Sequence, residues 1–398
     1  MNTEITIFLT LSFLLIIFTI VKRSNIRIEP MLSIPIGKRK IPIIYAVMYP
    51  TKFGLKFIDY LVSIFPRLFK RLGLFLIVLG FIGMIVIVYV FGSETLRIFS
   101  KPETITMSTV QLVLPFKTAT HLYVPLTFWL LSIFIIAVVH EGGHALIARA
   151  HRLRVKSTGF ATLNIILPII PMAYVDIDEK QMSARRAREQ LSVLSAGPIF
   201  NVVFSVLVAL LLVFVTTPIL NKNITYAGLE IVQSSQALLK EGEIIHFIEG
   251  IPIKNTRDLY FEVGLYNPGE IVEVTTNSGI YDVALLYGPA GTTVLGITVS
   301  QIIDFKESSL ERYGRLPLVS FKWFHNLMRW VFILSLGIGL FNLIPIGPID
   351  GGRIVKVLSE KSSKTYGTRI WKAVSYVFFV ILLILIFAPR IARIIGGL

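Results

Sequence analysis

Long apolar runs separated by short charged segments dominate the hydrophobic pattern of this chain. A helix that crosses a bilayer needs about 20 mostly apolar residues. Six runs approach or exceed that length, namely residues 5–21, 74–91, 122–148, 191–215, 330–345 and 374–388. A seventh run, 160–175, is interrupted by Pro168 and Pro171 and is too short for a plain span. The pattern predicts a polytopic α-helical membrane protein with about six spans.

Residues 217–317 break this pattern. Short β-prone runs at 243–248, 271–275, 281–286 and 294–299 are separated by turn signals such as Asn267-Pro268-Gly269 and Asn277-Ser278-Gly279. Residues 257–264 are predicted to form a short helix. The region is therefore expected to be a small β-rich domain outside the membrane.

Composition agrees with a membrane protein and narrows its chemistry. Hydrophobic residues make up 54% of the 398 residues and charged residues 16%, against about 45–50% and about 25% in soluble domains. The mean hydropathy is +0.74. The chain has no cysteine, which excludes disulfides, thiolate metal sites and cysteine nucleophiles. Any metal must bind to histidine, aspartate or glutamate.

The net charge of +15 is unevenly distributed along the chain. Residues 217–317 carry seven basic and twelve acidic residues, a net charge of −5, so the remainder carries +20. The basic residues gather in 22–71, 149–188 and 353–372, which the positive-inside rule places in the cytoplasm. This gives a multi-pass protein, expected in the cell membrane, with 217–317 outside the cytoplasm. The charge is thereby explained without nucleic acid as a partner.

The first apolar run is predicted to be an uncleaved anchor. A signal peptide is the alternative, but no basic residue precedes the run and no small-x-small cleavage site follows it.

A polar motif, His140-Glu141-Gly-Gly-His144, ends the third apolar run. Residues four apart share a helix face, so the two imidazoles can hold one cation, with Glu141 placed to act on water. In a soluble helix, such a motif could equally form part of an exposed helix face that is stabilised by salt bridges. Inside a membrane span three polar groups are costly and mark function, so the motif predicts a metal site.

The third protein ligand of a catalytic zinc site is expected to be Asp350. The remaining histidines are His121, His151, His246 and His325, and none lies convincingly near the motif in the predicted topology. Asp350 follows the fifth run at the same predicted cytoplasmic depth as His140 and His144. Its alternative role, capping the helix that follows, is compatible with metal binding.

Three motifs together resemble the site-2 protease family of intramembrane zinc metalloproteases. They are H-E-G-G-H at 140–144, S-A-G-P-I-F-N at 195–201 and N-L-I-P-I-G-P-I-D-G-G at 342–352. The resemblance covers about 122–388. It implies Zn²⁺ as cofactor, His140, His144 and Asp350 as metal ligands, and Glu141 as the catalytic glutamate. The same ligands would also accept cobalt or iron.

The resemblance further implies that Asn201 and Asn342 act on substrate or the oxyanion. A lone asparagine in a span could equally join two helices by a hydrogen bond.

Relatives carry a re-entrant β-hairpin between the metal helix and the next span. Here its strands are expected at 163–166 and 172–175, with 167–171 between them, and the alternative is an interfacial loop. Residues 237–253 resemble part of a PDZ domain, so the outer domain is expected to be PDZ-like.

Four regions follow from this interpretation. Residues 1–115 hold the anchor, a basic cytoplasmic loop and the second span. Residues 116–216 form the first part of the protease core, 217–317 the PDZ-like domain and 318–398 the second part of the core. The expected function is hydrolysis of peptide bonds in or near transmembrane segments of single-span substrates in the lipid bilayer, with a peptide or substrate segment bound at the PDZ-like domain.

Two other functions fit the same apolar pattern. A silent scaffold or chaperone of this fold would lack at least one of His140, Glu141, His144 and Asp350, and all four are present. A metal or ion transporter would distribute polar groups over several spans and depths, whereas here they gather at one depth.

Overall fold

The computed structural model describes residues 26–36, 39–102, 113–115, 122–165, 167–288 and 292–396, together with a few single positions. The chain divides into two compact units. Unit 1 comprises Met1–Leu212 and Asn326–Leu398, and unit 2 comprises Val213–His325. The expected first span lies outside the described residues except for four single positions, and His121 lies outside them altogether.

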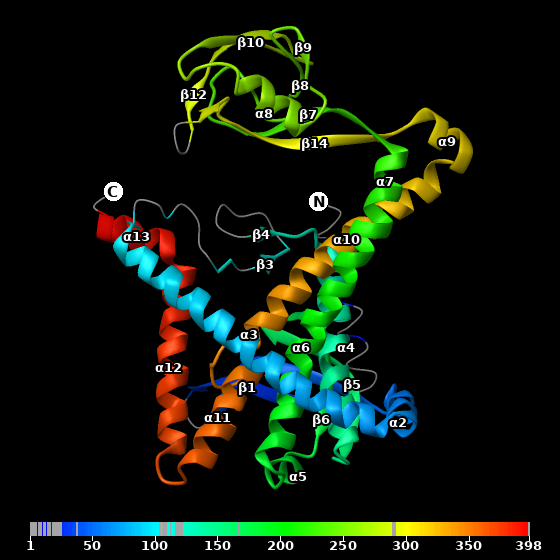
Figure 1. The fold of residues 1–398 in the computed structure, drawn as a ribbon, viewed down its shortest axis with the longest axis vertical. Coiled ribbons are helices and arrows are strands. Elements are labelled where there is room, and N and C mark those ends of the chain that lie inside the picture. The colour runs from blue at the N-terminus through cyan, green and yellow to red at the C-terminus, as the bar shows by residue number, and fades with distance from the viewer. Residues whose placement is uncertain are drawn as a thin grey trace. The chain divides into compact units, whose positions relative to one another are not determined.

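Five helices in the described residues are long and apolar enough to cross a membrane, and they coincide with five of the six expected spans. Three of them are α3 (Pro66–Ser100), α4 (Leu126–Ala150) and α12 (Gly367–Ile386). A fourth comprises α6 (Ala187–Leu211), a π-helical turn (Leu212–Thr216) and α7 (Thr217–Asn223). The fifth is α10 (Arg315–Phe341). Figure 1 shows α3 crossing α6.

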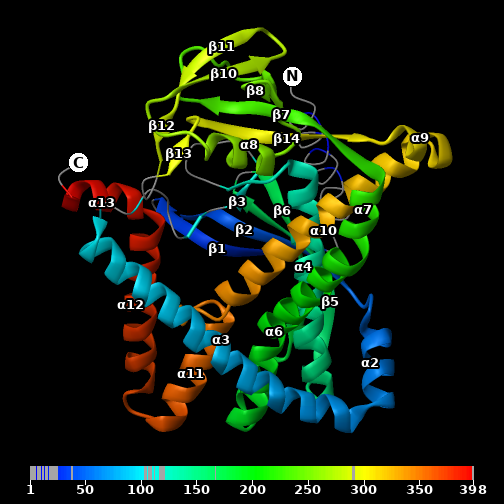
Figure 2. The same cartoon turned by 45° about the horizontal axis from the view of Figure 1, so that its top comes forward.

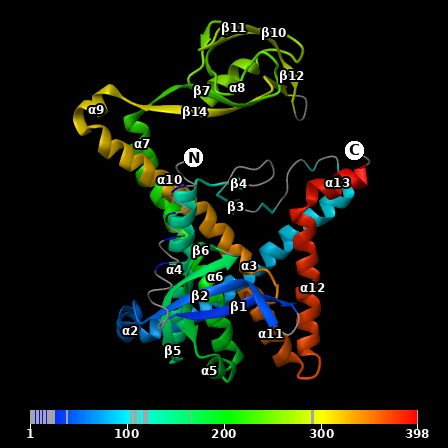
Figure 3. The ribbon, with the colours of Figure 1, turned by 180° about the vertical axis from the view of Figure 1, so that it is seen from behind.

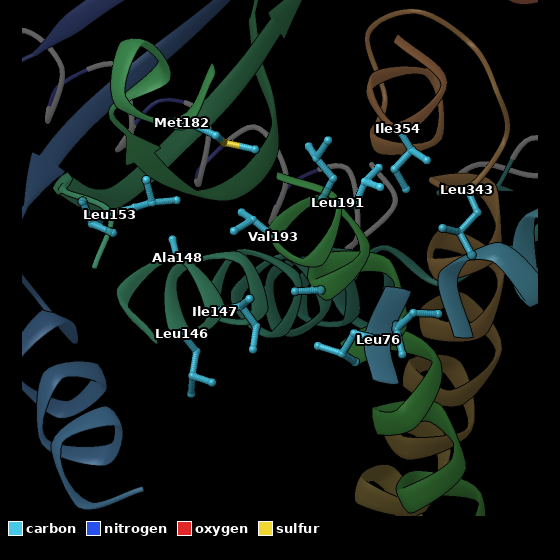
Figure 4. Packing of buried hydrophobic residues seen from close by; sticks show 14 of the residues in the cluster. Leu76, Leu146, Ile147, Ala148, Leu153, Met182, Leu191, Val193, Leu343 and Ile354 are labelled. Carbon is cyan, nitrogen blue, oxygen red and sulfur yellow. The ribbon is translucent and has the colours of Figure 1, made fainter. Parts of the chain in front are cut away.

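Small residues let α3 and α6 approach closely. Cβ atoms added at Gly73 and Gly80 would lie 3.2 Å and 2.9 Å from the Cβ atoms of Ser192 and Ser195. Close approach of small residues is how membrane helices gain packing energy when lipid removes the hydrophobic driving force. The main core cluster lies beside this crossing, and Figure 4 shows part of it. It contains Leu76 of α3, Leu146, Ile147 and Ala148 of α4, Leu191, Val193 and Leu194 of α6, and Leu343 and Ile354.

A four-stranded antiparallel sheet packs against α4. Its order is β1 (Arg27–Ile36), β2 (Arg39–Thr51), β5 (Val155–Ile165) and β6 (Leu167–Ile177), and Figure 3 shows these strands. The expected hairpin is present as β5 and β6, but its predicted limits are wrong. Residues 167–171 belong to β6 rather than to the connection, because proline is tolerated in an edge strand.

The sheet also corrects the expected basic loop. Residues 27–36 and 39–51, within the stretch predicted to be a loop, form the antiparallel strands β1 and β2, and β2 pairs with β5 from Ile44↔Ile165 to Thr51↔Thr158. A short helix, α2 (Leu55–Ile64), then leads to Pro66, which begins α3 because proline suits the first helical position.

A tight non-helical turn places Asp350 in the core of unit 1. Helix α10 ends at Phe341, and α11 (Asp350–Ser362) begins after residues 342–349. The backbone N–H of Gly351 donates to the carbonyl of Asn342 over 2.7 Å, closing the turn. A Cβ at Gly352 would lie 2.7 Å from the backbone nitrogen of Gly347, so only glycine permits this approach. Further short helices in unit 1 are α5 (Glu179–Ser183) and α13 (Ala388–Gly396).

Unit 2 is a β-sheet with one helix against it. The sheet order is β11 (Ile280–Ala284), β10 (Ile271–Thr276), β8 (Ile244–Ile248), β7 (Ile224–Ser234) and β14 (Ile297–Phe305), with β9 (Ile251–Pro252) on β8. Helix α8 (Thr256–Val263) begins at a capping box made by Asn255 and Asp258. Leu259 and Val263 of α8 belong to the apolar core, and Figure 2 shows α8 beside the sheet. The expected helix and three of the expected strands are confirmed, and the fourth, 294–299, overlaps the start of β14, whereas β7 was not anticipated.

Candidate metal centre

Two distant segments of unit 1 bring three ligand atoms together. His140 and His144 lie one turn apart on α4, and Asp350 begins α11, 210 residues after His140. Oδ2 of Asp350 lies 3.1 Å from Nε2 of His140 and 3.3 Å from Nε2 of His144, and the two Nε2 atoms are 3.2 Å apart. Within the described residues, this is the one cluster of three such side chains that could hold a metal.

Helix α6 presents a row of residues to these imidazoles at intervals of four. The backbone carbonyl of Val193 lies 2.7 Å from Nδ1 of His144. One turn later, a Cβ at Gly197 would lie 2.7 Å from Nε2 of His140, so glycine leaves the space that the two rings occupy. A further turn on, Nδ2 of Asn201 lies 3.1 Å from Nδ1 of His140. The spacing of the glycine–asparagine motif therefore matches the spacing of the two histidines.

The contact with Val193 fixes the tautomer of His144. A carbonyl oxygen only accepts hydrogen bonds, so Nδ1 of His144 carries the hydrogen and Nε2 keeps its lone pair. That lone pair, Nε2 of His140 and Oδ2 of Asp350 converge on one point. His144 and Asp350 are both buried. Converging electron pairs in a buried site are stabilised by a positive charge between them, which a metal ion or a proton can supply.

The donor set and its spacing fit zinc. Two imidazole nitrogens and one carboxylate oxygen are zinc ligands, and ligands about 2.0–2.1 Å from a tetrahedral ion lie about 3.3 Å apart. The observed separations are 3.1–3.3 Å. Three protein ligands leave a fourth position for water or substrate, as in catalytic rather than structural zinc sites.

Glu141 faces the same cavity as the three ligands. Its Oε2 accepts a hydrogen bond of 3.0 Å from the backbone N–H of Val175 on β6. The cavity has a volume of about 420 Å³ and is also lined by Arg27, Asp176 and Arg353. A glutamate held beside a metal site in a polar cavity is placed to accept a proton from water. Val175 is a residue that sequence reasoning missed, because a backbone donor leaves no signal in side-chain chemistry.

The two asparagines expected at substrate differ in position. Asn342 lines the polar cavity, and its Nδ2 donates to the carbonyl of Ile338 over 3.0 Å. Asn201 is fully buried, does not line that cavity and contacts the edge of His140 opposite to the metal-binding nitrogen. Its backbone carbonyl accepts a hydrogen bond of 2.9 Å from Oγ of Ser335. The substrate role of either residue stays a prediction.

Two described histidines outside the cluster, His151 and His325, have other partners. Nε2 of His151 lies 2.9 Å from Oγ of Ser192, and partial burial lowers the pKa of His151 below its usual range. His325 lies in unit 2 with its Nδ1 2.9 Å from Oγ1 of Thr216. Asp350 lies in the first turn of α11, where Ile349 is the N-cap residue, so its side chain faces the imidazoles rather than capping the helix.

Three comparisons with known proteins found similarities, and the match to a family model covers this site. The chain is 24% identical over 240 residues to an uncharacterized protein of Methanocaldococcus jannaschii, a match spanning 58% of this chain and 57% of that protein. The crystal structure of the PDZ domain of an SdrC-like protein from Listeria monocytogenes is similar at 22% identity and a TM-score of 0.18, covering 19% of this chain and 90% of that one. The model of peptidase family M50 matches residues 128–385, which include all three candidate ligands and Glu141. The chain therefore belongs to peptidase family M50, the site-2 protease family of metallopeptidases.

Proposed function

We propose that this protein is an intramembrane zinc metalloprotease that hydrolyses peptide bonds in or near the transmembrane segments of single-span substrates. The observation that carries the proposal is the convergence of His140, His144 and Asp350 beside Glu141 in one polar cavity. Five apolar helices of membrane-spanning length support a setting in the bilayer.

Each group has a distinct part in the proposed reaction. His140, His144 and Asp350 would hold Zn²⁺, which when bound supplies a Lewis acid for the scissile carbonyl and lowers the pKa of water. Glu141 takes a proton from the attacking water as the new carbon–oxygen bond forms. It then delivers that proton to the amide nitrogen as the carbon–nitrogen bond breaks. The N–H of Val175 orients the carboxylate for both transfers.

The sheet beside α4 offers a place for an unwound substrate. An intact helix has its backbone groups bonded internally, so the target has to become extended before cleavage. Strand β6 is an edge of the four-stranded sheet in the described structure, and its Val175 N–H turns toward Glu141. An extended substrate added along β6 would pass the catalytic glutamate, with main-chain hydrogen bonds giving affinity.

The outer unit and the sidedness of the membrane belong to the same proposal. Val213–His325 carries the acidic, β-rich region, which we assign as a PDZ-like domain outside the cytoplasm that binds a peptide or a substrate segment. The ligand cluster would lie toward the cytoplasmic side, where basic segments are concentrated.

Chelation tests the proposal. Purified protein in lipid vesicles with single-span substrates should cleave them, lose that activity with a zinc chelator and recover it when zinc is restored. Cleavage that persists after complete removal of metal would exclude metal-dependent proteolysis. Absence of cleavage for every substrate, with zinc bound, would favour the scaffold function.

Asn201 is proposed to position His140 rather than to contact substrate. With Nε2 of His140 bound to a metal, Nδ1 carries the hydrogen and needs an acceptor. Oδ1 of Asn201 is buried and has no hydrogen-bond partner in the described structure. Nδ2 of Asn201 lies 3.1 Å from Nδ1 of His140. Rotating the side-chain amide by 180° exchanges Nδ2 with Oδ1 and places the oxygen where it can accept the hydrogen of Nδ1.

Asn201→Ala is therefore expected to weaken zinc binding by about 10–100-fold, the usual loss when an orienting partner of a ligand is removed. Asn201→Asp keeps an acceptor and should retain most of the affinity. Zinc affinity measured by competition with a chromogenic chelator checks both variants. Unchanged affinity in Asn201→Ala with slower cleavage would instead support a role at the substrate.

A further inference from the structure

A second cavity lies on the other side of the contact between Glu141 and Val175. Its volume is about 400 Å³, and its walls are largely apolar. The main lining side chains come from α4, the β2–α2 connection, β5 and β6, and include Phe134, Val138, Phe53, Phe160 and Ala173. The polar cavity holds the metal cluster, whereas this one has no metal-ligand side chain among its lining residues.

The two cavities share part of their walls. Glu141, Tyr174 and Val175 line both of them. The hydrogen bond from the N–H of Val175 to Oε2 of Glu141 joins α4 to β6 between the two spaces. A substrate whose scissile bond lies at Glu141 therefore has the polar cavity on one side and the apolar cavity on the other.

Gly142 leaves this apolar cavity open. A Cβ added at Gly142 would have no atom within 4 Å, whereas one added at Gly143 would lie 2.9 Å from the ring of Phe200 and 3.1 Å from the carbonyl of Ala196. Gly143 is thus required where α4 packs on α6. At Gly142 packing imposes no such requirement, yet glycine is less favourable than alanine in a helix interior. Gly142 lines the apolar cavity, so the absence of a side chain there adds to the volume of that cavity.

We propose that the apolar cavity is a substrate-specificity pocket, which binds a large apolar side chain beside the scissile bond, and that Gly142 sets its size. This inference rests on the proposed function. An extended peptide directs successive side chains to opposite faces. A substrate strand along β6 would therefore place one side chain toward α4 next to Glu141, where Phe134, Val138 and Gly142 would surround it.

The occupant follows from the chemistry of the walls and from their position. Apolar walls favour side chains such as Leu, Ile, Met or Phe, and transmembrane substrates supply these residues. A lipid chain would match the walls equally well, but it would have no preferred relation to the cleavage site. Dependence of cleavage on one substrate residue therefore distinguishes the two occupants.

The test uses single-span substrates that differ only at the residues flanking the cleavage site, with Ala, Leu or Phe at each in turn. Wild-type protein should prefer Leu or Phe at one flanking position. Gly142→Leu should reduce the preference for Phe over Ala there by about 10–200-fold, the range that small changes in an apolar pocket produce. Phe134→Ala enlarges the pocket and should increase the preference for Phe over Ala at the same position.

Gly92→Leu is the matched control, because a Cβ at Gly92 also meets no atom within 4 Å and Gly92 lines neither cavity. This variant should keep the wild-type preference, and zinc content shows that each variant retains the metal centre. The pocket assignment would be wrong if Gly142→Leu and Phe134→Ala bind zinc and keep the wild-type ratios of cleavage rates among the substrates. It would also be wrong if they lose activity equally toward all substrates. Either result would leave the proposed function standing. If wild-type protein cleaves no substrate, both proposals fail.

Discussion

Glu141→Gln should lower the rate of substrate cleavage by about 10²–10⁴-fold, the typical contribution of a general base, and leave zinc content unchanged. Glutamine has the size of glutamate and retains an oxygen that can accept the N–H of Val175, so the 3.0 Å contact between α4 and β6 can persist. Only the ability to take a proton from water is lost. Single-turnover cleavage assays, combined with zinc analysis of the same preparation, measure both quantities.

Glu189→Gln is the control for this change. Glu189 lies in the first turn of α6 and lines neither of the two cavities, so its variant should cleave at the wild-type rate. Undiminished cleavage by Glu141→Gln would remove the proposed general base. Loss of cleavage accompanied by loss of zinc would show that Glu141 supports the metal site instead.

Asp350→Ala should lose zinc almost completely. The substitution removes one of three ligand atoms and leaves His140 and His144 with their Nε2 atoms 3.2 Å apart. Removing a partner that merely orients a ligand lowers metal affinity by about 10–100-fold. We expect the loss of zinc affinity in Asp350→Ala to be greater than that. Asp350→Asn, which preserves volume in this buried position, should also bind zinc weakly, because it lacks the negative charge.

Asp176→Ala provides the matched comparison for metal content. Asp176 lines the same polar cavity but pairs with Arg27 and Lys156, at 3.5 Å and 3.8 Å, rather than with the imidazoles. It should retain stoichiometric zinc in elemental analysis. Full zinc occupancy in Asp350→Ala would refute the assignment of the third ligand.

The apolar runs predicted the spanning helices well because length and hydropathy are local properties. The same holds for α8, whose Asn255 and Asp258 form a capping box within four residues. Strands β1 and β2 pair with each other locally, but the sheet that holds them is completed by β5, far along the chain, and both strands were missed. Pro42 and Pro50 lie within β2, and basic residues surround it, so the segment has the composition of a loop. Its partner β5 lies more than a hundred residues later in the chain.

The three candidate metal ligands were predictable because their chemistry restricts the choice. A chain without cysteine has few residues that can hold a metal, and Asp350 was the acidic residue next to the fifth apolar run. The position of Asn201 was not predictable in the same way. Its spacing from Gly197 indicates a helix face, but only the structure shows which edge of His140 that face meets. The role of Gly142 likewise depends on empty space, which no sequence motif records.

Mass spectrometry of cleavage products in ¹⁸O-enriched water tests the central claim most directly. Hydrolysis by this site predicts two fragments of a single-span substrate, cut within or beside its apolar segment. The new carboxyl group should carry ¹⁸O, and the products should be absent with chelator or with Glu141→Gln. Fragments cut only in soluble segments, or fragments that persist without metal, would contradict intramembrane metalloproteolysis.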